Sequence, residues 1–114
     1  MNELDYARIV ASRRQAEDTS GLHFSVWVGE SDEESHAHAE RLHAALPDPG
    51  RSVYVLCNVR LRTLEVVTGS AARRTLTDEE CVLATTSMKT LAAEGNVSEA
   101  LVSGLEHLGT YALD

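Results

Sequence analysis

The sequence predicts an α/β fold, a three-layer α/β/α sandwich with a small mixed sheet and the element order α-β-α-β-β-α-α. Three observations lead to it. Capping side chains followed three residues later by glutamate mark helix starts. Short apolar segments, alternating or continuous, mark strands. The length of 114 residues and the hydrophobic content of 43% suit one domain with one core, so we treat residues 1–114 as a single domain.

The first half of the chain predicts a helix, a strand and a second helix. Residues at helical spacing share one side of a helix at about 4–17: Tyr6, Ile9, Val10, Arg13 and Ala16. After the break at residues 18–21, apolar residues alternate with polar ones over 22–28, as in a strand. A helix at about 32–46 is expected to start at Ser31 and Glu34 and to end before Pro47.

The second half predicts a hairpin and two helices. Residues 52–57 are almost continuously apolar, which indicates a strand covered on both faces. A short turn around residues 60–62 leads to a strand over 64–68. The pairs Thr77/Glu80 and Asn96/Glu99 predict helices at 78–94 and 97–112. Because a helix joins the first two strands, we expect them to be parallel with a right-handed crossover.

The charge of the chain is −8, and it is unevenly distributed. So acidic a chain is a poor general ligand for nucleic acid or anionic lipid, and we expect it to bind neither. Residues 51–74 nevertheless carry five arginines against Glu65 alone, a local charge of +4. This strip either receives an anionic group or an acidic partner, or consists of solvated strand edges and weak ion pairs.

The chain shows no export or membrane signal. No apolar run approaches the roughly 20 residues that span a bilayer, and the start of the chain is acidic where a secretory signal is basic. Cys57 and Cys81 have no metal-ligand spacing, which favours structural thiols in a reducing compartment. We therefore expect a soluble, cytoplasmic protein.

The stretch SDEESHAHAERLH, residues 31–43, poses the question of a metal site. His36, Glu40 and His43 share one side of the predicted helix, whereas His38 points elsewhere. Zinc could bind such a stripe. The other side carries Ala39, Leu42, Ala45 and Leu46, which predicts that the histidines face open water, with no second element to complete a site. We therefore predict a solvated face and no metal here.

A second candidate lies in the loop after the third strand. Gly69 permits a sharp turn, and Arg73 and Arg74 stand close to the predicted helix start at Asp78 and Glu79. Free amides and arginines there would suit an anion, and the carboxylates would suit a hard cation such as calcium or magnesium. A plain capping box at Thr77 also accounts for these residues.

The order of these motifs resembles the TPM domain, a family found in photosystem-maintenance, bacterial membrane and nematode receptor-assembly proteins. The resemblance is carried by LHFSVWV, by VYVLCNVRLRTLEVVTG followed by SAARRTLTDEE, and by EGNVSEALVSGLEHL, and runs from about residue 7 to 112. Within the family, the chain looks similar to small TPM-like proteins of actinobacteria, a likeness that its nine arginines, one lysine and many alanines fit.

The resemblance implies an α/β sandwich and, for some members, calcium binding with a modest acid phosphatase activity. Asp78 matches an acid of the family and becomes the candidate calcium ligand. The acidic stretch that typically precedes the last helix is replaced by EGNVSE at 94–99, where only Gly95 and a weakened Asn96 match. The signal peptide and membrane anchor of typical members are missing too.

The sequence therefore favours a non-enzymatic domain that associates with another protein or with itself in an assembly or maintenance role. No catalytic residues and no bound cofactor are predicted. The competing hypothesis is a weak metal-dependent acid phosphatase, with Asp78 and Glu79 holding a cation and Arg73 and Arg74 steadying phosphate. A third is an anion-binding sensor that uses the same loop.

Overall fold

The computed structural model describes residues 1–113, which form helices and strands in the predicted order. The elements are α1 (Glu3–Ser20), β1 (His23–Gly29), α2 (Ser35–Ala44), the 3-10 helix η1 (Pro49–Arg51), β2 (Ser52–Asn58), β3 (Thr63–Thr68), the 3-10 helix η2 (Ala72–Arg74), α3 (Asp78–Ala93) and α4 (Val97–Tyr111). The α/β fold class predicted from the sequence is confirmed.

The three strands form one mixed sheet in the order β1-β2-β3. β1 and β2 are parallel, with His23 opposite Ser52, as the helical crossover between them predicts. β2 and β3 form an antiparallel hairpin, with Val53 opposite Thr68. Every residue of β2 is buried, so the prediction of a strand covered on both faces is confirmed. β1 and β3 are the two edges of the sheet.

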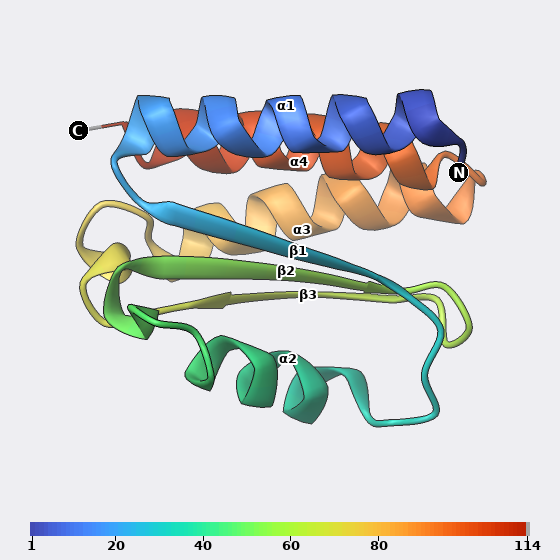
Figure 1. Ribbon diagram of the computed structural model, residues 1–114, viewed down its shortest axis with the longest axis horizontal. Helices are drawn as coiled ribbons and strands as arrows, with labels where there is room; N and C mark the ends of the chain where they lie inside the picture. Colours follow the sequence, from blue (N-terminus) through green and yellow to red (C-terminus); the bar gives the residue numbers. More distant parts are fainter. Residues whose placement is uncertain (114) are drawn as a thin grey trace.

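Helices cover both faces of the sheet (Figure 1). α2 packs against β2 and β3 on one face, while α1, α3 and α4 pack together on the other. The main core lies between the sheet and these three helices. It joins strand residues to helix residues, chiefly Phe24, Val53, Val55, Cys57 and Leu64 with Ile9, Met88, Leu101, Leu105 and Leu108.

The helix starts follow the capping patterns only in part. At α3 the predicted box forms: the Glu80 amide donates to Thr77 Oγ1 at 3.2 Å, and the Thr77 amide donates to Glu80 Oε1 at 2.9 Å. The box predicted at Ser31 is wrong. Ser31 Oγ instead accepts from the Glu33 amide in a turn, and α2 begins only after Glu34, whose carboxylate accepts from the Ala37 amide. Asn96 precedes α4 without a side-chain cap.

The hairpin between β2 and β3 closes through its own side chains. Asn58 Oδ1 accepts from the Leu61 amide at 3.2 Å, and the Asn58 amide group donates to the Ser31 carbonyl at 2.9 Å. Arg62 ends the turn with φ 54°, a left-handed conformation that hairpin loops often need at this place. The turn therefore holds β3 in register and fixes the position of Arg62.

Candidate functional site

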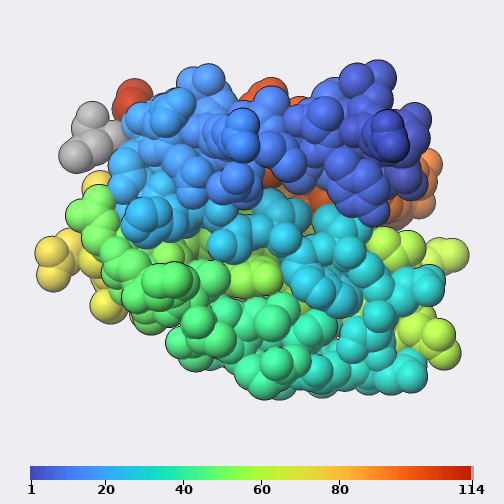
Figure 2. All heavy atoms as spheres, viewed as in Figure 1, coloured from blue at the N-terminus to red at the C-terminus, as the bar shows by residue number. Residues whose placement is uncertain are grey.

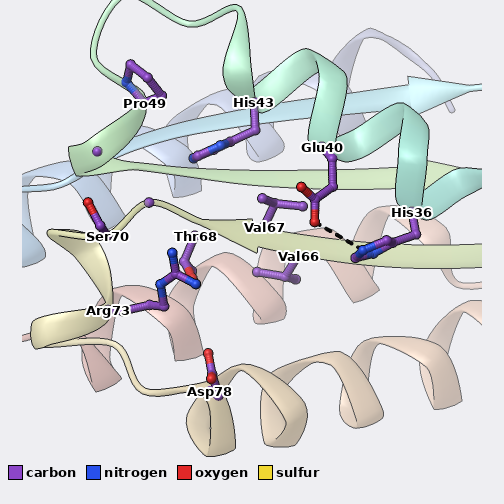
Figure 3. Close-up of a pocket in the computed structure, with 12 residues that line it drawn as sticks. His36, Glu40, His43, Pro49, Val66, Val67, Thr68, Ser70, Arg73 and Asp78 are labelled. Atoms are coloured by element: carbon purple, nitrogen blue, oxygen red, sulfur yellow. Dashed lines mark ion pairs between the residues drawn. The ribbon is translucent and has the colours of Figure 1, made fainter.

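Most of the residues singled out from the sequence come together at the outer edge of β3, in a cavity of about 460 Å³ that we call the β3-edge pocket, but Arg74 and Glu79 do not line it. α2 forms one wall, and the loop after β3 with the start of α3 forms the other (Figure 3). Its lining is His36, Glu40, His43, Pro49, Gly50, Val66, Val67, Thr68, Gly69, Ser70, Arg73 and Asp78. The two candidate stretches of the sequence thus face one another across a single strand.

The prediction that the histidine stripe is solvated holds for His36 and Glu40, whose side chains are 60% and 58% exposed, whereas His43 is half-buried. The expectation that no second element contacts the stripe is wrong. His36 Nε2 lies 3.1 Å from Glu40, and its Nδ1 lies 3.5 Å from Glu65 on β3. His43 Nε2 lies 3.0 Å from the Ser52 carbonyl of β2. Because α2 crosses the β2–β3 side of the sheet, the flank of the helix as well as its buried side meets the strands.

His38 is the histidine that the sequence did not single out as buried. It is only 6% exposed, and its ring meets Trp27 edge-on with 4.8 Å between ring centroids. Its Nδ1 has no hydrogen-bond partner within residues 1–113. His36 and His38 point to different sides of the helix, as their two-residue spacing predicts. The side that His38 occupies is the one that packs against the strands.

The loop after β3 supplies the pocket's cation and its second carboxylate. Gly69 lets β3 pass close to η1: a Cβ added there would lie 1.9 Å from the Pro49 carbonyl oxygen. Figure 3 shows the Arg73 side chain extending toward Thr68, with Asp78 on the side away from α2. Arg73 has no ion-pair partner in the described chain, although Asp78 shares the pocket with it.

Metal ligation receives no support from the side chains. Across residues 1–113, no group of three His, Cys, Asp or Glu side chains stands close enough to hold a metal ion. Asp78 lines the pocket, but Glu79 is not part of the lining. The role of Asp78 as a calcium ligand remains a prediction.

A second hollow runs along the free edge of β1, and we call it the β1 groove. α1 forms one wall with Tyr6, Ile9, Val10 and Arg13, and the strand supplies residues 24–28, with Tyr54 behind them. The cavity measures about 570 Å³. In Figure 2 the atoms of β1 form a strip on the front face, between α1 and α2. Sequence patterns predicted this strand but gave no sign that it is an edge.

Both thiols have raised pKa values. Burial raises the pKa of Cys57. Burial, with the nearby carboxylates of Asp78 and Glu80, raises the pKa of Cys81 to about 11. Both cysteines are free, and both thiols stay protonated at neutral pH, which agrees with the predicted structural role.

Comparison with known proteins now places the chain. The model of a family described as a domain of unknown function (DUF5130) matches residues 2–109. The chain belongs to this family. No curated protein matches it. Within the described residues, no helix is long and apolar enough to cross a membrane.

Two solved structures share the fold of this DUF5130 domain. The NMR structure of the BA42 protein from the psychrophilic bacterium Bizionia argentinensis has a TM-score of 0.87 at 17% identity, over 98% of this chain and 81% of that chain. The N-terminal domain of the cg2496 protein from Corynebacterium glutamicum has a TM-score of 0.81 at 13% identity, over 96% of this chain and 72% of that one. Likeness at such low identity shows the fold alone.

The family assignment made from the sequence is therefore wrong. The motifs that suggested the TPM domain match a DUF5130 model instead, and no TPM model matches. The narrower assignment to actinobacterial TPM-like proteins is therefore unsupported as well. The quoted motifs describe a strand, hairpin and helix order, and unrelated families that share a fold also share such an order.

Proposed function

We propose that this domain is a non-enzymatic association module that binds an extended segment of a partner protein as an added strand along β1. The observation that carries the proposal is the free edge of β1 in the β1 groove. Alternate residues of a strand turn their backbone groups to the same side. The Phe24 amide and carbonyl point away from β2, since they bond to Glu17 and Arg13 of α1 at 3.0 and 3.4 Å.

Val26 and Val28 share this outward orientation. Within residues 1–113, neither has a backbone hydrogen bond on that side. Each therefore offers one donor and one acceptor at the strand edge. Proteins usually protect such edges with charge, proline or a covering segment. Here α1 occupies the groups of Phe24 and leaves the next two open, which suits strand addition by a partner.

The walls of the groove support an apolar segment. Tyr6 is 53% exposed and Val10 is 40% exposed, one helical turn apart on the side of α1 that overlooks β1. Half-buried Trp27 lies on the strand itself. The exposed tyrosine and valine of α1, with the half-buried tryptophan of the strand, supply apolar contacts beside the open backbone groups that strand addition uses.

The charged residues at one end of the groove indicate which charge the partner segment carries there. Beyond Val28 the β1 groove continues into an adjoining hollow. This hollow shares Tyr6 and Val28 with the groove and is also lined by Asp5 and Glu30. Among residues 1–113, no basic side chain lines that hollow. We therefore propose a partner segment of alternating apolar residues with a lysine or arginine near the Val28 end.

The proposal is tested by selecting binders from a displayed library of random peptides. Selected peptides should carry an alternating apolar pattern with a basic residue, and their binding should protect the Val26 and Val28 amides from hydrogen exchange. Tyr6→Ala with Val10→Ala should weaken binding by about tenfold or more, because interface aromatics carry much of the energy. The matched control is Val82→Ala with Leu83→Ala, at 63% and 59% exposure on α3.

Val26→Pro gives a second, independent measurement. It removes an outward N–H without a ladder bond to β2, so the fold should survive and peptide binding should be lost. Peptides that protect α3 amides, or that bind both groove variants unchanged, would overturn the proposal. Concentration-dependent dimers that Val26→Pro abolishes would identify a second copy as the occupant instead.

A second candidate function, anion binding with weak phosphatase activity, draws on the β3-edge pocket. Its specific support is Arg73, which stands beside Ser70 and Thr68 with no paired acid in the described chain. If it holds, inorganic phosphate raises the melting temperature and Arg73→Gln removes the effect, whereas Arg74→Gln does not. Turnover of a generic phosphomonoester that is lost in Asp78→Ala would establish the enzymatic form.

A further inference from the structure

A fourth cavity lies at the opposite end of the β2–β3 hairpin from the β3-edge pocket, and we call it the hairpin pocket. It measures about 590 Å³, within the roughly 300–1,000 Å³ of small-molecule sites. The hairpin contributes one wall, and the end of α3 with the start of α4 contributes the other. Its lining is Cys57, Val59, Arg62, Thr63, Leu64, Lys89, Ala92, Ala93, Gly95 and Val97.

The walls of the hairpin pocket are mainly apolar. Leu64 and Cys57 are 3% and 4% exposed and form its floor against the main core. Ala92 and Val97 pack against the same core and are half-buried. Because the side chain of Ala92 on α3 is small, it leaves room between this helix and the hairpin. These surfaces would cover a hydrocarbon chain.

The charged residues of the hairpin pocket are both cations. Arg62 comes from the hairpin and Lys89 from α3, and both are exposed. Within residues 1–113 neither makes an ion pair or a side-chain hydrogen bond, and no acid lines the cavity. These two cations give the cavity a local positive charge in a chain of charge −8, where acids outnumber bases by 18 to 10.

We infer that the hairpin pocket binds an amphipathic monoanion: an unbranched hydrocarbon chain of medium length ending in a carboxylate. The chain would lie against Leu64, Ala92 and Val97, and Arg62 and Lys89 would receive the carboxylate. Arginine and lysine both form charge-assisted hydrogen bonds with carboxylates. The site shares no lining residue with the β1 groove, although Val59, Gly95 and Val97 also line the hollow beyond Val28. Its apolar floor and its two cations belong to the hairpin pocket alone.

The test is a titration of the ¹⁵N-labelled protein with octanoate, followed by the amide shifts of Thr63 and Ala92, which line the hairpin pocket alone. Hexanoate should bind more weakly by about fourfold for each missing methylene, the factor that corresponds to about 0.8 kcal/mol per buried methylene. Octanol, which keeps the chain and lacks the charge, should bind about three- to tenfold more weakly than octanoate.

Variants separate the two parts of the site. Lys89→Gln and Arg62→Asn should each weaken octanoate about two- to threefold and leave octanol unchanged. Asparagine is chosen because it tolerates the left-handed backbone of Arg62. Arg14→Gln, an exposed arginine of α1, is the matched control. Ala92→Leu should reduce the binding of both ligands by filling the cavity.

Three results would overturn the inference: no shifts at millimolar octanoate, shifts that cluster on the β1 groove, or equal affinities for octanoate and octanol. Unchanged octanoate binding in the Lys89→Gln and Arg62→Asn variants would equally rule out the two cations as its receptors. The peptide-binding test reports on different amides, so failure of one proposal leaves the other standing.

Discussion

At the scale of single residues, Gly69 is the glycine at which an added side chain would come closest to main-chain atoms. A Cβ there would lie 1.9 Å from the Pro49 carbonyl oxygen and 2.4 Å from that of Gly50, both of them main-chain atoms. We expect Gly69→Ala to cost about 3 kcal/mol of unfolding free energy, since the backbone must move to accept it. Urea unfolding measures the loss. Gly50→Ala is the control, because its nearest neighbour is Ser70 Oγ at 3.9 Å.

Ser103 gives a prediction of opposite sign. Its hydroxyl is buried in α4 and has no hydrogen-bond partner within residues 1–113. Burying an unpaired hydroxyl costs free energy, and alanine is also the better helix former. Ser103→Ala should therefore raise the unfolding free energy by about 1 kcal/mol, measured by the same urea titration. A destabilised Ser103→Ala would show that a water or a shifted rotamer satisfies the hydroxyl.

At the scale of elements, α1 and α4 approach closely because their contact uses small residues. A Cβ on Gly109 would lie 2.8 Å from the Cα of Ala16 and 3.0 Å from its Cβ. Gly109→Ala gains about 1 kcal/mol of helix propensity but pushes two rigid backbones apart. We expect the clash to win, with a net loss of about 1–2 kcal/mol in a thermal or urea melt. Thr110→Ala, exposed on the same turn, should be nearly neutral.

Elements are also the scale at which the sequence predicted most. Helix periodicity and capping act between residues three or four apart, so the four helices and three strands could be placed to within a few residues. α2 was placed three residues too early, because Glu34 and not Ser31 caps it. Whether β1 is an edge depends on which strands pair in space, and no local pattern records that.

The candidate sites show the same limit. Spacing placed His36, Glu40 and His43 on one side of a helix, and that is confirmed by their shared pocket. It could not show that β3 and Arg73 stand opposite, since those contacts join residues about 30 positions apart. For the same reason, the sequence singled out Arg62 only as one arginine of the strip at residues 51–74, and it did not single out Lys89. Only the fold brings them to one cavity.

At the scale of the whole molecule, alkaline pH should lower the free energy of unfolding, because buried thiol and phenol groups lose their protons less easily in the folded chain. Burial raises the pKa of Cys57 and Tyr54, and burial with Asp78 and Glu80 raises that of Cys81 from its ordinary value near 9 to about 11. The folded chain thus holds these protons more tightly than the unfolded chain. The stability contributed by Cys81 is fully present below about pH 9 and is lost as the pH rises through 11.

Comparing the parent protein with the Cys81→Ala variant isolates the contribution of Cys81 to this loss of unfolding free energy. Urea unfolding of the parent protein at about pH 8 and about pH 10.5 should show a fall in unfolding free energy between the two. Cys81→Ala should show a smaller fall, because Tyr54 and Cys57 still titrate in it while position 81 does not. Equal losses in the two chains would mean that the thiol of Cys81 ionises as easily in the folded as in the unfolded state. A reagent for thiolates would then label Cys81 at neutral pH as fast in the native protein as in urea.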